Sequence, residues 1–257
     1  MSEIIVKKDG AIAIVTLSNP AKLNAIDSAM WRSLAEAFAN LSQDASLRCV
    51  IVRGDGRNFA AGADIAEFAT VRNTLEQGIE YHTAVIADAL ESIASCLHPT
   101  VAAIEGVCIG GGLEIACACD LRIASSTSRF GIPINRLGFP LAPSELQGLL
   151  QLVGKAAALE ILLEGRVFDA AEAKEKRLIH RIVDDVPAEA LAVAQRIASG
   201  APLAARINKQ LIRRMVPASE PLTEQELRAA FAFLESDDYR EGMQSFLEKR
   251  KPDFIGR

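Results

Sequence analysis

Histidine and aromatic residues are scarce in this chain of 257 residues, and their scarcity excludes several classes of protein. There are three histidines, and neither an HExxH motif nor a Cys/His cluster accompanies them, so we expect no metal site. Ten Phe, two Tyr and one Trp are too few for the stacking surfaces of a single-strand nucleic-acid binder. Because 33 acidic residues outnumber 28 basic ones, we expect no nucleic-acid partner.

The cysteines and the apolar runs also lack the pattern of a secreted or membrane protein. Five cysteines are an odd number, and Cys117 and Cys119 have one residue between them instead of the two of a CxxC pair. We interpret them as buried free thiols in a reducing compartment. The N-terminus does not resemble a secretory signal, and apolar runs such as residues 149–153 are far shorter than the roughly 18 residues of a membrane span. We therefore expect a cytoplasmic chain without a membrane partner.

Segments typical of strands and helices alternate through the first half of the chain. Residues 4–6 and 11–17 read as two strands joined at Asp9-Gly10, a strong hairpin signal. Residues 29–41 and 76–95 have the pattern of helices. Continuous apolar runs at 49–52, 101–104 and 121–124 suit strands that are buried on both faces. This alternation predicts a parallel or mixed sheet covered by helices.

After about residue 143 the pattern becomes mainly helical. The expected helices are residues 144–153, 155–163, 169–177, 187–199, 202–215 and 221–250, with one short strand at 179–183. The sequence thus predicts an α/β core with a helical C-terminal extension.

Two loops made of small residues are candidates for chemistry. Residues 59–65 follow the strand 49–52 and include Ala61, Gly62 and Ala63, whose small side chains let a ligand approach the backbone. The same residues also fit an ordinary tight loop, in which Asp64 caps the helix that follows.

The second loop, residues 106–114, follows the strand 101–104 and places three glycines at the start of a helix. Unpaired N–H groups at a helix start favour an anion, but the spacing matches neither GxGxxG nor GxxxxGK[ST], so a nucleotide site has little support. An oxyanion hole with one N–H from each loop has more. Glu114, within one turn of the glycines, suits proton transfer next to a held carbonyl and equally suits a first-turn acid stabilised by the helix dipole.

In this order and spacing, the two loops resemble those of the enoyl-CoA hydratase/isomerase (crotonase) superfamily. The resemblance also includes residues 20–26, 119–124, 163–170 and 241–250, so it covers nearly the whole chain. It implies an α/β fold: a crotonase-like spiral of ββα units at residues 1–195, followed by a helical C-terminal region at 196–257 for trimerisation and completion of the CoA site. It also implies a homotrimer or a dimer of trimers.

The resemblance assigns roles to individual residues. The N–H groups of Ala63 and Gly111 would hold the thioester carbonyl of an acyl-CoA, and Glu114 would be the acid/base. CoA, as part of the substrate and not as a tightly bound cofactor, would contact a set of residues that also includes one from a neighbouring subunit. These are Lys22, Leu23, Ala25, Ala61, Asp64 and Ile65, with Lys249 supplied by the neighbour.

One departure from the family pattern bears on the reaction. The hydratases have a second catalytic glutamate, and this chain has Ile134 at that position. We interpret Glu145 as a capping acid at a helix start and His82 as a surface or core residue. With Glu114 as the single carboxylate, a double-bond shift is easier to support than hydration, and both stay open. An acyl-CoA hydrolase, a decarboxylase and a catalytically impaired acyl-CoA binding protein are the alternatives.

Overall fold

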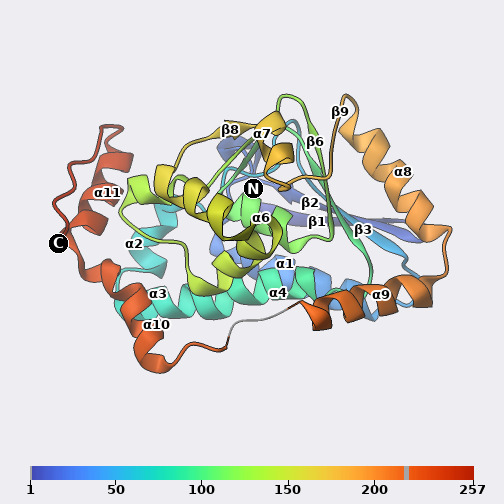
Figure 1. Ribbon diagram of the computed structural model, residues 1–257, viewed down its shortest axis with the longest axis horizontal. Coiled ribbons are helices and arrows are strands. Elements are labelled where there is room, and N and C mark those ends of the chain that lie inside the picture. Colours follow the sequence, from blue (N-terminus) through green and yellow to red (C-terminus); the bar gives the residue numbers. More distant parts are fainter. Residues whose placement is uncertain (1, 217–219) are drawn as a thin grey trace.

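A six-stranded sheet forms the centre of the computed structural model, which describes residues 2–216 and 220–257 (Figure 1). The strands are β1 (Glu3–Asp9), β2 (Ile12–Ser18), β3 (Cys49–Gly54), β4 (Thr100–Ile104), β6 (Leu121–Ser125) and β9 (Arg181–Val183), in the order β1-β2-β3-β4-β6-β9. The first pair is antiparallel, as the predicted hairpin requires, and every following pair is parallel. The predicted mixed sheet is confirmed.

Both faces of the sheet are covered, which explains the continuous apolar runs. In β3, Val50 and Val52 point into one apolar cluster, whereas Cys49 and Ile51 point into the other. The larger cluster contains α1 (Ser28–Gln43) and α4 (Ala87–Ala94), and the smaller one contains α8 (Val186–Ala198). Because side chains alternate along a strand, an apolar residue is needed at every position.

A second, three-stranded sheet lies beside the first and consists of β5 (Val107–Ile109), β7 (Arg129–Gly131) and β8 (Phe168–Asp169). A single bridge joins Ala60 to Cys108 of β5. This bridge brings the loop after β3 against the strand that leads into α5 (Gly111–Ala118). The two loops made of small residues therefore meet although about 50 positions separate them.

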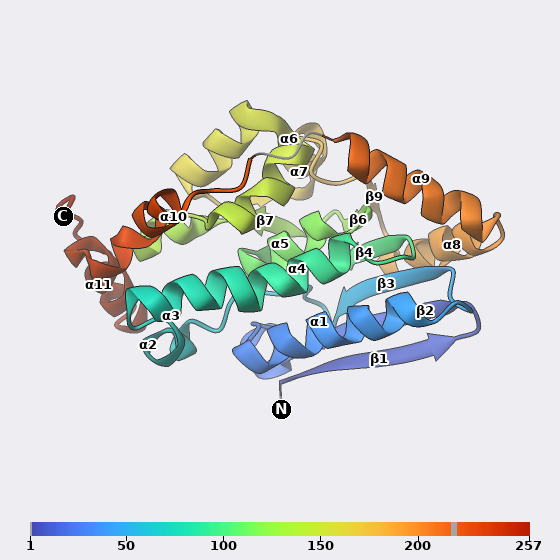
Figure 2. The ribbon, with the colours of Figure 1, turned by 90° about the horizontal axis from the view of Figure 1, so that it is seen from below.

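The predicted helix at 76–95 consists of three consecutive segments. Helix α3 (Leu75–Glu80) passes into a π-helical segment, η3 (Tyr81–Ile86), and then into α4; Figure 2 shows α3 and α4 in line. The shorter α2 (Phe68–Val71) precedes them. A π-helical turn inside an α-helix is rare and is frequent at functional sites. The second residue of this one is His82.

Helix α6 (Pro143–Glu164) spans the two helices predicted at 144–153 and 155–163. Its backbone is non-helical at Gly154, with φ 73° and ψ 171°, where the prediction separated them. By length and composition alone, α6 is the one helix among the described residues that is long and apolar enough to cross a membrane.

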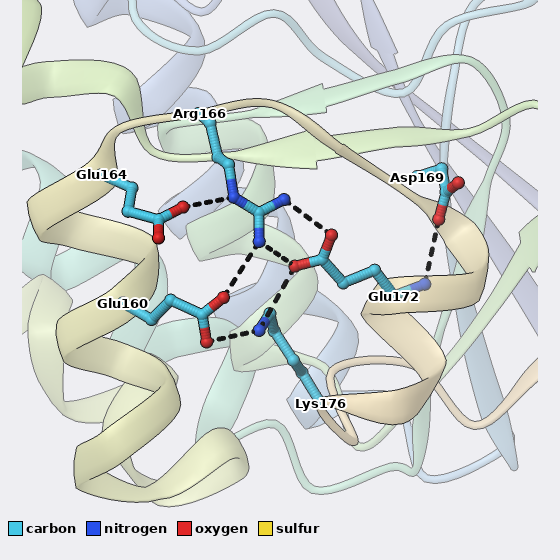
Figure 3. A network of polar contacts seen from close by, with 6 residues as sticks. All are labelled: Glu160, Glu164, Arg166, Asp169, Glu172 and Lys176. Atoms are coloured by element: carbon cyan, nitrogen blue, oxygen red, sulfur yellow. Dashed lines mark hydrogen bonds and ion pairs between the residues drawn. The ribbon is translucent and has the colours of Figure 1, made fainter.

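A network of ion pairs joins the end of α6 to α7 (Ala170–Glu175) (Figure 3). The Arg166 guanidinium donates to Glu160, Glu164 and Glu172, and Lys176 binds Glu160 at 2.6 Å. Asp169 caps α7 by accepting from the Glu172 N–H at 2.9 Å. These hydrogen bonds raise the pKa of Arg166 and lower the pKa of Glu160 and Glu172. This network explains the run of charged residues at 164–176 as a structural feature.

The two ends of the molecule consist of helices. Figures 1 and 2 place α8 and α9 (Pro202–Met215) at one end, and α10 (Glu224–Phe231) and α11 (Asp237–Leu247) at the other. The prediction of one helix at 221–250 was wrong, because the 3-10 turn η5 (Ala232–Glu235) and Ser236, which caps α11, interrupt it. The division into residues 1–195 and 196–257 stays a prediction; α8 runs across it.

Candidate active site

A cavity of about 750 Å³ lies between the two loops of small residues, the α2–η3 region, η4 (Pro133–Leu137), the start of α6 and the C-terminal end of α11. Its walls differ in character. One wall consists of backbone: the loops around Ala61–Ala63 and Ile109–Gly111. We call this the backbone wall. Another wall carries the side chains of Arg72, His82, Glu114 and Glu145, and we call it the charged wall.

The backbone wall places two N–H groups side by side. The two loops are so close that a Cβ added to Gly111 would lie 3.5 Å from the Ala63 nitrogen, and one added to Gly62 would lie 3.6 Å from the Gly111 nitrogen. Among the described residues, neither the Ala63 nor the Gly111 N–H donates a hydrogen bond. The Gly111 N–H is the first of α5, where the helix provides no acceptor. Both residues line the cavity, so it has two donors without an intramolecular acceptor at its wall.

The glycines of this wall are required by the close contact between the loops. A Cβ on Gly112 would lie 2.4 Å from the Ala60 carbonyl oxygen, and one on Gly111 would lie 2.9 Å from the Trp31 ring. Gly62 and Gly110 have φ values of 103° and 50°, which side-chain-bearing residues rarely adopt. The residues are small because backbone must approach backbone here.

Glu114 occupies the first turn of α5, next to the two donors. Its side chain lines the cavity, and the residue is only 8% exposed. Burial raises the pKa of Glu114 well above its usual range, and the nearby Glu145 carboxylate adds to this shift. A buried carboxyl group with a raised pKa suits general acid/base chemistry near neutral pH.

The predicted helix start at Pro143-Ser144-Glu145 is confirmed, with Glu145 in the first turn of α6, but the prediction that Glu145 caps this helix was wrong. At the start of α6 no side chain caps the helix, and Glu145 instead turns into the cavity wall, where it is 5% exposed. Its Oε1 lies 2.5 Å from His82 Nδ1, and His82 Nε2 lies 3.1 Å from Arg72 Nη1. His82 is thus a buried member of the cavity wall, which excludes a surface position.

The predicted CoA-contacting residues are mostly brought together. Five of them line the cavity: Lys22, Ala25, Ala61, Asp64 and Ile65. Lys22 Nζ lies 2.5 Å from Asp64 Oδ2, and this hydrogen bond raises the pKa of Lys22. Leu23 is exposed and lies outside the lining. Lys249 follows the end of α11 and is also outside it.

Sequence reasoning missed several lining residues. Arg250 and Lys251 of this same chain line the cavity where a contribution from a neighbouring subunit was predicted. Arg72 and Trp31 belong to segments without a motif. His82 and Glu145 were noticed, but nothing in the sequence showed that residues 63 positions apart would form a hydrogen bond. Most of the charged wall is formed by contacts between residues far apart in the sequence, and a local sequence pattern does not predict such contacts.

The other ionisable groups fit a structural role. All five cysteines are buried, and burial raises the pKa of Cys49, Cys117 and Cys119 to about 12, so these thiols behave as small apolar groups. Within residues 2–216 and 220–257, no group of three or more His, Cys, Asp or Glu side chains is arranged to hold a metal ion.

Two free N–H donors beside a buried carboxyl group form a site suited to a carbonyl oxygen that gains negative charge while a proton moves nearby. The chain belongs to the enoyl-CoA hydratase/isomerase family, whose sequence model matches residues 7–257. The fold is the crotonase fold, and the chain is an acyl-CoA enzyme of the hydratase/isomerase type.

Individual relatives cover almost the entire chain. A protein of Mycobacterium tuberculosis named "Probable enoyl-CoA hydratase echA8" is 36% identical over 263 residues, covering 99% of this chain and 98% of the relative. A solved enoyl-CoA hydratase/carnithine racemase from Magnetospirillum magneticum is 47% identical, with a TM-score of 0.82, and covers 100% and 97%. Methylmalonyl CoA decarboxylase complexed with 2S-carboxypropyl CoA is 27% identical, with a TM-score of 0.88, and covers 99% and 98%.

Proposed function

We propose that this chain catalyses the reversible addition of water to the C2–C3 double bond of an enoyl-CoA thioester, through an enolate. The observation that carries this proposal is the pair of free N–H groups, Ala63 and Gly111, beside the buried Glu114. The thioester oxygen accepts from both N–H groups, and they stabilise the negative charge that it gains. Removing one such donor typically costs about 2.7–4 kcal/mol of transition-state stabilisation.

Glu114 moves a proton at the carbon next to the thioester carbonyl. In the hydration direction its carboxyl group protonates C2 of the enolate, and in dehydration its carboxylate removes that proton. The raised pKa of Glu114 keeps the protonated form available at neutral pH, which the hydration direction needs.

The CoA part of the substrate binds along the loop of Lys22 and the end of α11. Lys22, Arg250 and Lys251 line the cavity, and their positive charges suit the phosphates of CoA. Arg250 is also held by Glu241, at 2.7 Å between Nη2 and Oε2. In this proposal the chain supplies most of its own CoA site, with Lys249 of a neighbouring subunit as an additional contact, and needs no tightly bound cofactor.

Double-bond isomerisation is the second candidate, and one specific observation favours it. Ile134 lines the cavity at the position where the family pattern has a second glutamate. Of the two positions that hold a catalytic glutamate in the family pattern, only Glu114 therefore provides a carboxylate here. A single base is sufficient to remove a proton from one carbon and return it to another, whereas hydration also needs an activated water.

Product analysis separates these reactions. The enzyme is incubated in turn with a 2-enoyl-CoA, a 3-enoyl-CoA and a carboxylated acyl-CoA, and the products are identified by mass spectrometry. Hydration gives the 3-hydroxyacyl-CoA from the first, isomerisation moves the double bond of the second, and a decarboxylase releases CO₂ from the third. Release of free CoA would indicate a hydrolase. Tight binding of all three without product would contradict the proposal and indicate a binding protein.

We also propose that the protein is a homotrimer or a dimer of trimers. The polar side of α9 faces its own chain: Lys209 Nζ lies 2.7 Å from Asp120 Oδ2, and Arg206 donates to the Leu47 carbonyl at 3.2 Å. Its apolar side is exposed, at Leu203, Ile207, Leu211, Ile212 and Met215. An apolar helix face in water favours association. Light scattering in solution tests this, and a monomer at micromolar concentration would contradict it.

A further inference from the structure

The charged wall is unusual because it buries four ionisable side chains from four separate segments in one place. Arg72 is 1% exposed, His82 4%, Glu145 5% and Glu114 8%. Charged side chains are seldom buried without a partner or a function. Buried ionisable groups that line a cavity are candidates for a catalytic role.

The hydrogen bonds of this wall have a fixed direction. A guanidinium only donates, so the Arg72 Nη1 group, 3.1 Å from His82 Nε2, makes that nitrogen an acceptor. A neutral imidazole then carries its proton on Nδ1, and Nδ1 donates to Glu145 Oε1 at 2.5 Å. These two hydrogen bonds, from Arg72 to His82 and from His82 to Glu145, thus fix the orientation of the Glu145 carboxylate. Among the described residues, its other oxygen, Oε2, accepts no hydrogen bond.

Arg72, which donates the first of these hydrogen bonds, is surrounded by aromatic rings. Its guanidinium carbon lies 4.2 Å from the ring centres of both Phe68 and Phe139, and 5.1 Å from that of Tyr239. No carboxylate within residues 2–216 and 220–257 forms an ion pair with it. The positive charge of Arg72 therefore acts on Glu145 through His82 and is not neutralised by another partner.

Helix formation does not explain why Glu145 is buried. Neighbouring positions of α6 such as Ser144 and Gln147 are exposed. An acid in the first turn of a helix need not be buried either, because Glu189 in α8 is only partly buried and forms ion pairs with two arginines at the surface. Burying the Glu145 carboxylate is costly, and the hydrogen bond from His82 offsets part of that cost. The π-helical segment that begins at Tyr81 is a second local departure, and it places His82 against Glu145.

Glu145 and Glu114 line the same two cavities. Both line the substrate cavity, and both line a second cavity of about 780 Å³ between α4, α5, α6 and α9. Burial and the charge of Glu145 raise the pKa of Glu114, which suits Glu114 to serve as the acid while the second carboxylate serves as the base. This is the division of roles that adding water to a double bond requires.

We propose that Glu145 is the second acid/base of this active site, held in place by Arg72 through His82, and that it takes the role for which Ile134 has no functional group. This inference rests on the proposed function. Glu145 Oε2 accepts a proton from water as the water oxygen bonds to C3. The C2–C3 electron pair moves onto the thioester as an enolate, and Glu114 gives its proton to C2. The dehydration direction reverses each transfer.

The Glu145→Gln variant tests the catalytic role. Loss of a general base typically lowers the rate by about 10²–10⁴-fold, so we expect kcat for hydration of a 2-enoyl-CoA to fall by that factor with little change in KM. Exchange of the α-protons of a saturated acyl-CoA with deuterated water should persist, because it needs only Glu114 and the two N–H groups. Hydration within a few-fold of the wild-type rate would overturn the inference.

A matched control variant keeps this result interpretable. Glu189→Gln removes an acid from the first turn of α8, far from the cavity, and should leave kcat and KM unchanged. Circular dichroism and thermal melting check that each variant is folded. If Glu145→Gln lost α-proton exchange together with hydration, Glu145 would act through the fold or on Glu114, and its separate role would be refuted. A wild-type enzyme without exchange and without hydration would overturn the proposed function, and this inference with it.

Variants of His82 test the positioning role. His82→Asn retains a side-chain N–H near the position of Nδ1, whereas His82→Leu keeps the bulk without a donor. We expect kcat to fall about tenfold or more in the Leu variant, equivalent to about 1.4 kcal/mol, and to recover in large part in the Asn variant, with KM little changed in both. Equal kcat in the two variants would contradict a role for the hydrogen bond to Glu145.

Discussion

The two walls of the cavity achieve function by different means. The backbone wall uses N–H groups at Ala63 and Gly111, and its side chains are small because they must not obstruct the loops. The charged wall uses four large ionisable side chains that packing removes from water. The backbone wall depends on the lack of large side chains in two loops. The charged wall depends on where helices that are distant in the sequence meet, and burying its charged groups lowers the stability of the fold.

The largest effect that we expect comes from the residue where the two walls meet. Glu114→Gln removes the group that moves the α-proton and leaves the N–H pair intact. We expect turnover of a 2-enoyl-CoA to fall by at least about 10²–10⁴-fold, and the binding of a saturated acyl-CoA to change little. Steady-state kinetics and calorimetric titration measure these quantities. Activity close to wild type would remove Glu114 from the mechanism.

The backbone wall is tested by two substitutions at Gly111. Gly111→Ala and Gly111→Pro both place a Cβ 2.9 Å from the Trp31 ring, but only proline removes the N–H. Proline is well tolerated at the first position of a helix, which Gly111 occupies in α5. The proline variant should therefore be about 10²–10³-fold slower than the alanine variant. Equal rates in two folded variants would show that the Gly111 N–H does not stabilise the transition state.

Most of the backbone wall could be predicted from the sequence, but little of the charged wall could. Small residues contiguous in two loops, each after a buried strand, indicated Ala63 and Gly111, and the structure places their N–H groups together. The strands and most helices followed from periodicity. By contrast, Glu145 has the local features of a capping acid, and only the packing of α6 against the π-helical segment turns it inward.

Ile134→Glu distinguishes the two positions for a second carboxylate. If Glu145 provides the second acid/base, a glutamate at Ile134 adds only a third negative charge to a cavity that already holds two carboxyl groups. We expect hydration to stay the same or to fall by up to about tenfold, because like charges disfavour ionisation of the existing pair. A gain of tenfold or more would show instead that the enzyme lacks a second acid, and that Glu145 does not supply one.

The smallest expected effect concerns stability. Because the pKa of Glu114 is raised in the folded state, the unfolded state releases this proton first as pH rises from about 4.5. Wild type therefore loses stability relative to Glu114→Gln as pH rises through the range between the unfolded and folded pKa, and below that range the two differ least. Urea unfolding at pH 4 and at pH 7 measures this difference. A constant difference between the two pH values would contradict the raised pKa.

In the proposed function, the two N–H groups and Glu114 together stabilise and protonate a thioester enolate. Exchange of the α-protons of a saturated acyl-CoA with deuterated water isolates this step, because such a substrate has no double bond to hydrate or to shift. The exchange is followed by NMR or mass spectrometry. We predict exchange in the wild-type enzyme, its loss in Glu114→Gln, and a strong reduction in Gly111→Pro. Absence of exchange in the wild type, or exchange that persists in Glu114→Gln, would contradict the claim.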